Sequence, residues 1–270
     1  MNIIDKFKDE RILRIENYSS DIELIDAKNT FKIESIRAQY SYNFDWLSRP
    51  IIQYPQDMVA MQELIWAIKP DLIIETGIAH GGSLILSASM LALIDYCEAA
   101  ESGKVLDPAA SKRRVLGIDI DIREHNLEAI KKHPLSHKID MLQGSSIAPE
   151  IVSQVYEIAE KHEKIIVFLD SLHTHDHVLE ELEAYAPLTS FDSYCVVFDT
   201  IIEDLPPESF PDRPWDIGNN PKTAVWEYLK RLKNEGRKAY DSSPLNFEID
   251  KVIENKLLIT VAPDGFLKRI

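Results

Sequence analysis

Acidic and imidazole side chains follow two apolar segments in the second half of the chain. Asp170 comes directly after the apolar run 165–169, and His173 stands three residues later. Asp199 has the equivalent place after the apolar run 194–198. If both runs are parallel strands, their carboxyl ends meet at one edge of a sheet and the three side chains share a crevice. Two converging carboxylates repel each other unless a proton or a cation lies between them, so we expect a metal-ligating pair beside a general base, His173.

Two further histidines, His175 and His177, flank Asp176 directly after this group. Their spacing places them in the polar cap and first turn of the next helix. We therefore interpret His175 and His177 as structural residues and assign catalysis to His173.

A glycine turn after an earlier apolar segment can hold a cofactor. Glycines let the backbone approach a ligand closely, and the free N–H groups at the start of the following helix point into the same crevice. Ser83 is preceded by glycine and not by the lysine of an ATP or GTP loop. The carboxylate two residues before Gly77 suits a positively charged ligand, such as the ammonium and sulfonium groups of S-adenosylmethionine. The expected cofactor contacts here are Glu75, Gly77, His80, Gly81, Gly82 and Ser83.

Further cofactor contacts are expected at the ends of the next two strands and at Asp170. Asp119 ends the run that begins at Arg114 and is the better candidate for a ribose diol, with Asp121 as the second candidate. Gly77 and Asp119 lie 42 positions apart, about twice the ~20 of a dinucleotide fingerprint, which argues against a nicotinamide cofactor. Ser145 and Ser146 suit the edge of an adenine, although a simple turn explains them equally well.

From residue 70 onward the hydrophobic pattern alternates between strand and helix. The expected strands are 71–76, 114–119, 138–143, 164–170, 193–199, 246–253 and 256–262, and the expected helices are 56–69, 83–100, 123–133, 149–162, 176–187 and 221–235. The last two strands are separated only by Asn255 and predict a hairpin with one antiparallel strand. This α/β outline is that of the class I S-adenosylmethionine-dependent methyltransferase, a Rossmann-like sheet that is mostly parallel with a C-terminal antiparallel hairpin.

Two segments are expected outside this sheet. Residues 1–57 form an N-terminal helical extension that packs on the active-site side of the domain 58–270. Residues 203–220 are rich in Pro, Asp and Asn, and a long loop beside a strand end is usually a lid or binding loop.

Composition excludes several partners. The net charge of −15 argues against nucleic acid and anionic membranes, and 270 residues with 45% hydrophobic content suffice for one large α/β core. The apolar run 84–97 is too short to span a bilayer, so no membrane insertion is expected. Cys97 and Cys195 stand in apolar surroundings, and the amino terminus has no signal-peptide pattern. We therefore expect a cytoplasmic protein.

Several ordered motifs together resemble one family. They are the runs 40–46, 49–57, 74–83, 170–173, 199–200 and 214–221. In this order they resemble the cephalosporin hydroxylase family of S-adenosylmethionine-dependent O-methyltransferases, which is related to macrolide-sugar O-methyltransferases. The resemblance covers nearly everything after residue 36 and implies methyl transfer, despite the family's name. It also implies a sugar, glycan or secondary-metabolite acceptor, and we expect a homo-oligomer.

The resemblance further implies Mg²⁺ held by the acid after the fourth strand and by a Glu-Asp pair after the fifth. Carried over by position, Asp170 and Asp199 are ligands and His173 is the base. The sequence departs from the family at Phe198, which replaces the Glu of that pair. We therefore expect a weak magnesium site, with Glu203 as a possible substitute, and restoring a Glu at position 198 is expected to tighten it.

Aromatic and polar residues in the two outer segments offer a surface that a sugar prefers. Equally, they can fasten those segments to the domain, and the sequence leaves both interpretations open. The candidate acceptor residues are Tyr42, Trp46, Gln53, Trp215 and Asn219.

Two other classes remain open at this point. A nicotinamide-dependent sugar oxidoreductase or epimerase lacks support in the glycine spacing, and no Tyr-x-x-x-Lys occurs in the chain. A catalytically inactive relative that still binds S-adenosylmethionine is suggested by Phe198, although Glu75, Asp119, Asp170 and His173 argue for activity.

Overall fold

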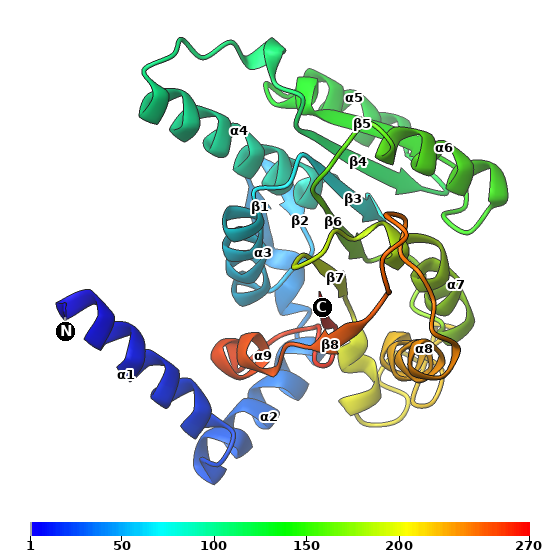
Figure 1. The fold of residues 1–270 in the computed structure, drawn as a ribbon. Coiled ribbons are helices and arrows are strands. Elements are labelled where there is room, and N and C mark those ends of the chain that lie inside the picture. The colour runs from blue at the N-terminus through cyan, green and yellow to red at the C-terminus, as the bar shows by residue number, and fades with distance from the viewer. Residues whose placement is uncertain (1) are drawn as a thin grey trace.

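A computed structural model of the chain describes residues 2–270 and shows a central seven-stranded sheet (Figure 1). The strands lie in the order β5-β4-β3-β6-β7-β9-β8. Five of them pair in parallel, and β9 runs antiparallel to both β7 and β8. Their bounds are β3 Leu72–Thr76, β4 Arg114–Asp119, β5 Ile139–Gln143, β6 Ile165–Leu169, β7 Tyr194–Val197, β8 Phe247–Ile249 and β9 Phe266–Arg269. The expected mostly parallel sheet is confirmed.

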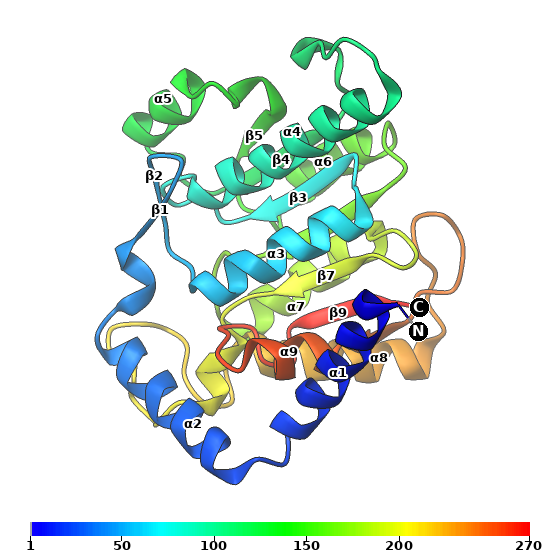
Figure 2. The same ribbon diagram turned by 90° about the vertical axis from the view of Figure 1, so that its left-hand side faces the viewer.

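Helices cover both faces of the sheet, as Figure 2 shows. Apolar residues of α3 Pro55–Ile68, α4 Gly82–Ser102 and α5 Glu124–Lys132 pack on one face, together with α9 Lys251–Leu257. The other face is covered by α6 Pro149–Ala159, α7 His175–Tyr185 and α8 Pro221–Glu235. By length and composition α4 could cross a membrane, but 56% of its most apolar window is buried inside the molecule, as in the core helix of a globular domain.

The central strand β6 is apolar at every position because both of its faces are covered. In β6, Ile166 and Phe168 pack into the layer of α3 and α4. Ile165, Val167 and Leu169 pack into the layer of α6, α7 and α8. The strand therefore ends with fixed register, and Asp170 emerges at a defined place.

The C-terminal hairpin exists, but its predicted residues were wrong. Only Phe247–Ile249 of the first segment is strand, and residues 251–257 form α9. The side chain of Asp250 accepts hydrogen bonds from the N–H groups of Val252 and Ile253, which starts a helix. Ile253 and Leu257 are buried four residues apart, a spacing that a helix and a strand both allow, so the cap decides between the two. The second strand of the hairpin is β9, close to the end of the chain.

The N-terminal segment forms the helices α1 Ile3–Tyr18 and α2 Ile22–Arg37. The two helices make a V below the sheet in both views (Figures 1 and 2), and α1 packs beside α9. A short hairpin follows, with β1 Phe44–Trp46 and β2 Arg49–Ile51. It packs on the start of α4.

Candidate active site

The sheet brings Asp170, His173 and Asp199 together. One ligand atom of each lies within 4.8 Å of the other two, and His173 Nε2 is 3.1 Å from Asp199 Oδ2. The grouping follows from the adjacent parallel strands β6 and β7, after which the two aspartates emerge. Asp199 has a left-handed backbone, with φ of 53°, where the chain turns into the 3₁₀ helix Thr200–Asp204.

Negative charge accumulates around Asp170. Its pKa lies well above the ordinary value because the carboxyl is buried and because Asp199, Glu75 and Glu181 repel its ionised form. The amide of Gln53 donates a hydrogen bond to Asp170 Oδ2 at 3.0 Å, and this bond lowers the pKa of Asp170 by a smaller amount. The cluster therefore favours a bound proton or cation.

The loop after Asp199 covers His173. The rings of His173 and Trp215 lie 4.7 Å apart and nearly perpendicular. The guanidinium of Arg213 lies over the Trp215 ring, 5.4 Å from the ring centroid. The imidazole is thus held between a carboxylate and an aromatic ring, at the edge of the segment expected to be a lid.

His175 makes structural contacts, as the sequence interpretation expected. It is the first residue of α7, and its backbone N–H donates to Asn219 Oδ1 at 2.9 Å. Its ring contacts Thr223 Oγ1 at 2.8 Å and Glu227 Oε2 at 3.3 Å. His175 therefore joins α7 to the lid and to α8.

The lid is fastened at its end by polar contacts. Glu203, the possible metal ligand, accepts hydrogen bonds from the Gly218 N–H at 2.8 Å and from the amide of Asn220. It does not belong to the group of Asp170, His173 and Asp199. The side chain of Asn219 is likewise used within the protein, because its amide also donates to the Pro214 carbonyl.

Phe198 belongs to the hydrophobic core, and the group of described residues that could hold a metal consists of Asp170, His173 and Asp199. The Phe198 side chain is 2% exposed and packs in the core, with its ring 6.2 Å from that of Phe168. Two carboxylates and one imidazole therefore make the donor set, and two hard oxygen donors suit Mg²⁺ if other oxygens complete the shell.

The glycine turn lies beside this cluster and has the geometry of a cofactor cradle. Gly77 has a φ of 87°, and a Cβ there would lie 1.9 Å from the carbonyl oxygen of Asp170. Gly81 also has a positive φ, and a Cβ on Gly82 would lie 2.3 Å from the Pro50 carbonyl oxygen. Only glycine fits these positions, so S-adenosylmethionine would meet bare backbone at the start of α4. Ser83 is half-buried in the first turn of that helix.

Asp119 and its neighbours line the next strand end. Asp119 Oδ2 accepts hydrogen bonds from the N–H groups of Ile78 at 2.8 Å and Ala79 at 3.3 Å, and Oδ1 accepts from that of Asp121 at 3.0 Å. Asp119 is half-buried, whereas Asp121 is exposed. Asp119 therefore also shapes the glycine turn, a role that the sequence did not indicate.

Glu75 lies beneath the turn and not in the open crevice. It is 3% exposed and accepts a hydrogen bond from the Ser87 hydroxyl of α4. Burial raises its pKa to about 7, against the opposing hydrogen bonds of Ser87 and Ser83. A positive ligand above it would favour the ionised form.

Ser146 points toward α7. Its hydroxyl lies 3.1 Å from His177 Nε2, and its carbonyl accepts from the Tyr185 hydroxyl. The same His177 atom is 3.1 Å from the hydroxyl of Ser171. His177 thus links the loop after β5 to the loop after β6, while Ser145 stays half-buried at the turn.

The candidate acceptor residues of the N-terminal segment separate into two kinds. The Trp46 indole donates to the Ser89 hydroxyl at 3.0 Å and fastens β1 to α4. Tyr42 is 58% exposed, and Gln53 is 4% exposed beside Asp170. Gln53 and Tyr42 therefore stay available to the acceptor hypothesis.

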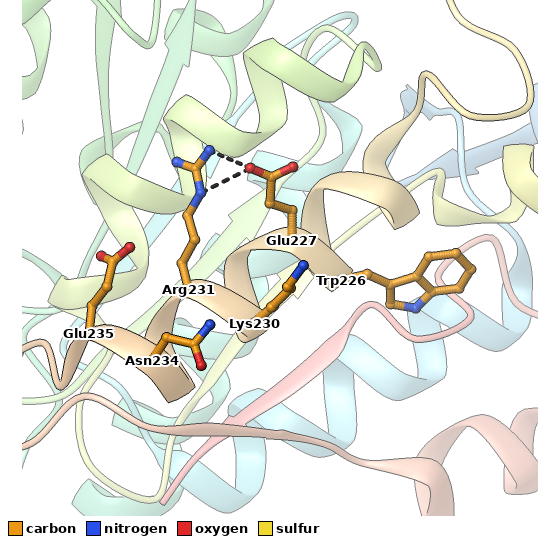
Figure 3. A pocket seen from close by; sticks show the side chains of 6 residues that line it. All are labelled: Trp226, Glu227, Lys230, Arg231, Asn234 and Glu235. Atoms are coloured by element: carbon orange, nitrogen blue, oxygen red, sulfur yellow. Dashed lines mark hydrogen bonds and ion pairs between the residues drawn. The ribbon is translucent and has the colours of Figure 1, made fainter.

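A hollow of about 470 Å³ lies elsewhere, on the outer face of α8. Figure 3 shows it between side chains of this helix, including the paired Glu227 and Arg231. All of its lining residues belong to one helix, so it has no part in the crevice.

Sequence comparisons place the chain among known proteins. The profile of the family described as Rhamnosyl O-methyltransferase/CmcI matches residues 38–270. A rhamnosyl O-methyltransferase of Mycobacterium tuberculosis is 29% identical over 218 residues, which are 79% of this chain and 73% of that protein. The enzyme of the same name from Mycobacterium leprae is 27% identical over 225 residues, which are 83% of this chain and 82% of that protein.

Solved structures agree on the fold. A CmcI structure with Mg and SAM aligns with a TM-score of 0.50 and 16% identity, over 85% of this chain and 77% of that one. An apo CmcI structure aligns over the same shares with a TM-score of 0.51 and 16% identity.

The sheet, the glycine turn and the profile match together define an S-adenosylmethionine-dependent methyltransferase of class I. The chain belongs to the Rhamnosyl O-methyltransferase/CmcI family. Neither the nicotinamide-dependent oxidoreductase nor the inactive relative receives support from these matches.

Proposed function

We propose that this enzyme transfers the methyl group of S-adenosylmethionine to a hydroxyl group of a sugar, carried by a small molecule or a glycan. The observation that carries the proposal is the cluster of Asp170, His173 and Asp199 directly beside the glycine turn. A base next to a cofactor cradle is what O-methylation needs, because the acceptor hydroxyl must lose a proton as it attacks.

In the proposed reaction His173 Nδ1 accepts the proton of the acceptor hydroxyl. The other ring nitrogen, Nε2, lies 3.1 Å from Asp199 Oδ2, and this carboxylate holds the ring in place and stabilises the imidazolium that forms. The sulfonium of S-adenosylmethionine supplies the electrophilic methyl group. Trp215 closes the crevice on the side of His173, which limits the entry of water. Orientation of the two reactants provides much of the rate.

Asp170 and Asp199 would hold Mg²⁺ in this proposal. When bound, the ion supplies Lewis acidity that lowers the pKa of an oxygen it contacts. The raised pKa of Asp170 supports a cation at this place, because burial and Asp199 both disfavour its ionised form when no partner is present. The absence of a third carboxylate at Phe198 supports a weak site.

A deoxyhexose such as rhamnose is the acceptor class that we propose. The relatives in the two Mycobacterium species are named as rhamnosyl O-methyltransferases. The half-buried Trp215 and the exposed Tyr42 provide aromatic faces of the kind that pack against apolar sugar faces. We further propose a cytoplasmic location, and we propose a homo-oligomer, which is supported by exposed apolar side chains of α1 such as Ile3, Phe7 and Leu13.

Calorimetry and a transfer assay test this function. S-adenosylmethionine is expected to bind in the micromolar range, and Asp119→Ala is expected to weaken it by roughly one to two decades, the cost of two hydrogen bonds. Mass spectrometry after incubation with aryl rhamnosides is expected to show a gain of one methyl group. Binding of NAD with no heat from S-adenosylmethionine would refute the proposal.

A further inference from the structure

Three polar side chains from outside hold the glycine turn, residues 77–81. Asp119 at the end of β4 accepts from its amides, as described above. The other two are Arg49 of β2 and Asn126 of α5, and both bind its carbonyl oxygens. The turn is therefore fixed on its N–H side and on its C=O side by different elements.

Arg49 and Asn126 form one connected set of hydrogen bonds. Arg49 Nε donates to the His80 carbonyl at 3.0 Å, and Nη2 donates to the same oxygen. Nη2 also donates to Asn126 Oδ1 at 2.9 Å. The amide of Asn126, a residue 3% exposed, donates to the Ala79 carbonyl at 2.9 Å. Two consecutive carbonyls of the turn are thus held by two side chains that also hold each other.

The turn needs such support because its backbone is strained. Ala79 has a φ of 45°, in the left-handed region that a residue with a Cβ seldom adopts. Strained residues persist only where surrounding contacts determine them. Among the described residues no ion pair of Arg49 with a carboxylate is found, and its guanidinium donates to the His80 carbonyl and to the side-chain amide oxygen of Asn126 instead.

We propose that Arg49 and Asn126 are positioning residues for S-adenosylmethionine. They act through the backbone of Ala79 and His80, which they keep in the conformation that opens the glycine cradle. This inference rests on the proposed placement of the cofactor at residues 77–82. It assigns to the β1–β2 hairpin a part in cofactor affinity and none in proton transfer.

Binding of S-adenosylhomocysteine to the full chain tests the inference by calorimetry. Arg49→Met keeps the apolar stem of the side chain and is expected to weaken binding by roughly tenfold, the value of one to two hydrogen bonds. Asn126→Ala is expected to have a similar effect. The double variant is expected to lose less than the product of the two losses, because both residues fix the same turn. In a transfer assay the loss is expected in the KM for S-adenosylmethionine and to a much smaller extent in kcat.

Two controls sharpen the experiment. Arg37→Met removes an exposed arginine that pairs with Glu34 and is expected to leave binding unchanged. 5′-Methylthioadenosine lacks the amino-acid end of the cofactor and is expected to lose affinity for Arg49→Met by the same factor.

Three results would overturn the inference. Arg49→Met and Asn126→Ala could both bind as tightly as Arg37→Met. The loss could be confined to S-adenosylhomocysteine, which would mean direct contact between Arg49 and the amino-acid end. The two losses could multiply, which would mean independent roles. Failure to methylate a sugar contradicts only the proposed acceptor, because the three results that decide the inference are all binding results.

Discussion

Among the described residues, His173 is the only histidine in the group that contains both Asp170 and Asp199. His173→Ala is therefore expected to lower turnover by about 10²–10⁴-fold with cofactor affinity nearly unchanged. Steady-state kinetics and calorimetry measure the two quantities.

His175→Ala serves as the comparison for this prediction, because His175 contacts Asn219, Thr223 and Glu227 and not the aspartates. Its effect on turnover is expected to be far smaller. Equal losses at the two positions would show that the histidines matter only for structure.

The donor set of Asp170 and Asp199 also predicts a response to metal removal. EDTA is expected to depress activity without lowering the melting temperature, and added Mg²⁺ is expected to restore it. Asp199→Asn is expected to raise the Mg²⁺ concentration needed for half-maximal activity by about tenfold or more, because it removes one charge from a site with only two carboxylates. Full activity in exhaustively chelated buffer would show that His173 works without a metal.

The buried place of Phe198 changes one expectation drawn from the sequence. A Glu at this position would lie against Phe168 in the core, so Phe198→Glu would bury a charge before it could reach the crevice. Truncation of a buried Phe to Ala alone costs about 3–5 kcal/mol, and a buried charge adds to this cost. Lower stability, rather than tighter magnesium binding, is therefore the expected result.

At the scale of elements, the strand ends were predictable from the sequence and their partners were not. Asp170, Asp199 and Asp119 stand at the ends of short apolar runs that indicate buried strands, and parallel pairing brings these ends to one edge. Arg49 and Asn126 bind backbone carbonyls of a turn, and such contacts leave no periodic pattern. The sequence of α9 was predicted as strand because its short apolar run fits the hydrophobic period of a helix and that of a strand. The N-cap hydrogen bonds of Asp250 favour the helix.

Asp57 at the start of α3 makes a pH-dependent contact between elements. Its carboxylate accepts hydrogen bonds from the Thr260 hydroxyl and from the Val261 N–H, and it is fully buried. Burial raises its pKa to about 7, with a smaller contribution from Asp199, against these two hydrogen bonds. The folded state therefore keeps a proton that the unfolded chain releases near pH 4. The contribution of this proton to the free energy of unfolding is fully present below about pH 4, and it is lost as the pH rises through about 7.

Asp57→Asn removes this dependence. The free energy of unfolding of the variant, relative to the wild type, is expected to rise by roughly 2–3 kcal/mol between pH 5 and pH 8. Urea denaturation at the two pH values measures it. Asp241→Asn is the control, because hydrogen bonds from Arg269 and from Ser243 lower the pKa of Asp241 to about 2, far below this range. Its cost is expected to be constant over this range, and a parallel change in both variants would contradict the assignment to Asp57.

At the scale of the whole molecule, the family profile and the observed fold begin at different places. The profile starts at residue 38, whereas α1 and α2 precede it. Only Ile15 of α1 is a buried residue, so α1 adds little to the core. The second helix, α2, is anchored more firmly, since Ser35 Oγ lies 2.7 Å from Tyr54 Oη and Phe31 packs on Tyr40.

A further anchor of α2 reaches the base of the lid. Lys32 Nζ lies 3.7 Å from Asp204 Oδ2, and Lys222 of α8 holds the other oxygen of Asp204 at 2.6 Å. Burial lowers the pKa of Lys32, while the pairing with Asp204 raises it, so the pair lies in partly dry surroundings. The lid that carries Trp215 thus begins near Asp204, whose carboxylate pairs with Lys32 of α2 and with Lys222 of α8.

Stepwise removal of the extension is expected to separate these two helices. Deletion of residues 2–20 is expected to change turnover by no more than about threefold, because α1 has few buried contacts. Deletion of residues 2–37 is expected to lower turnover by roughly tenfold or more, the equivalent of about 1.4 kcal/mol, through loosening of the lid over His173. Calorimetry is expected to show S-adenosylhomocysteine affinity within about threefold of the full chain, since the cofactor turn is held by β2, β4 and α5.

Lys32→Met should reproduce part of the loss of turnover in the full-length protein, and Lys8→Met on α1 should not. Unchanged turnover after removal of both helices would contradict a role of α2 in holding the lid, and a matching loss of cofactor affinity would mean that the whole domain had loosened.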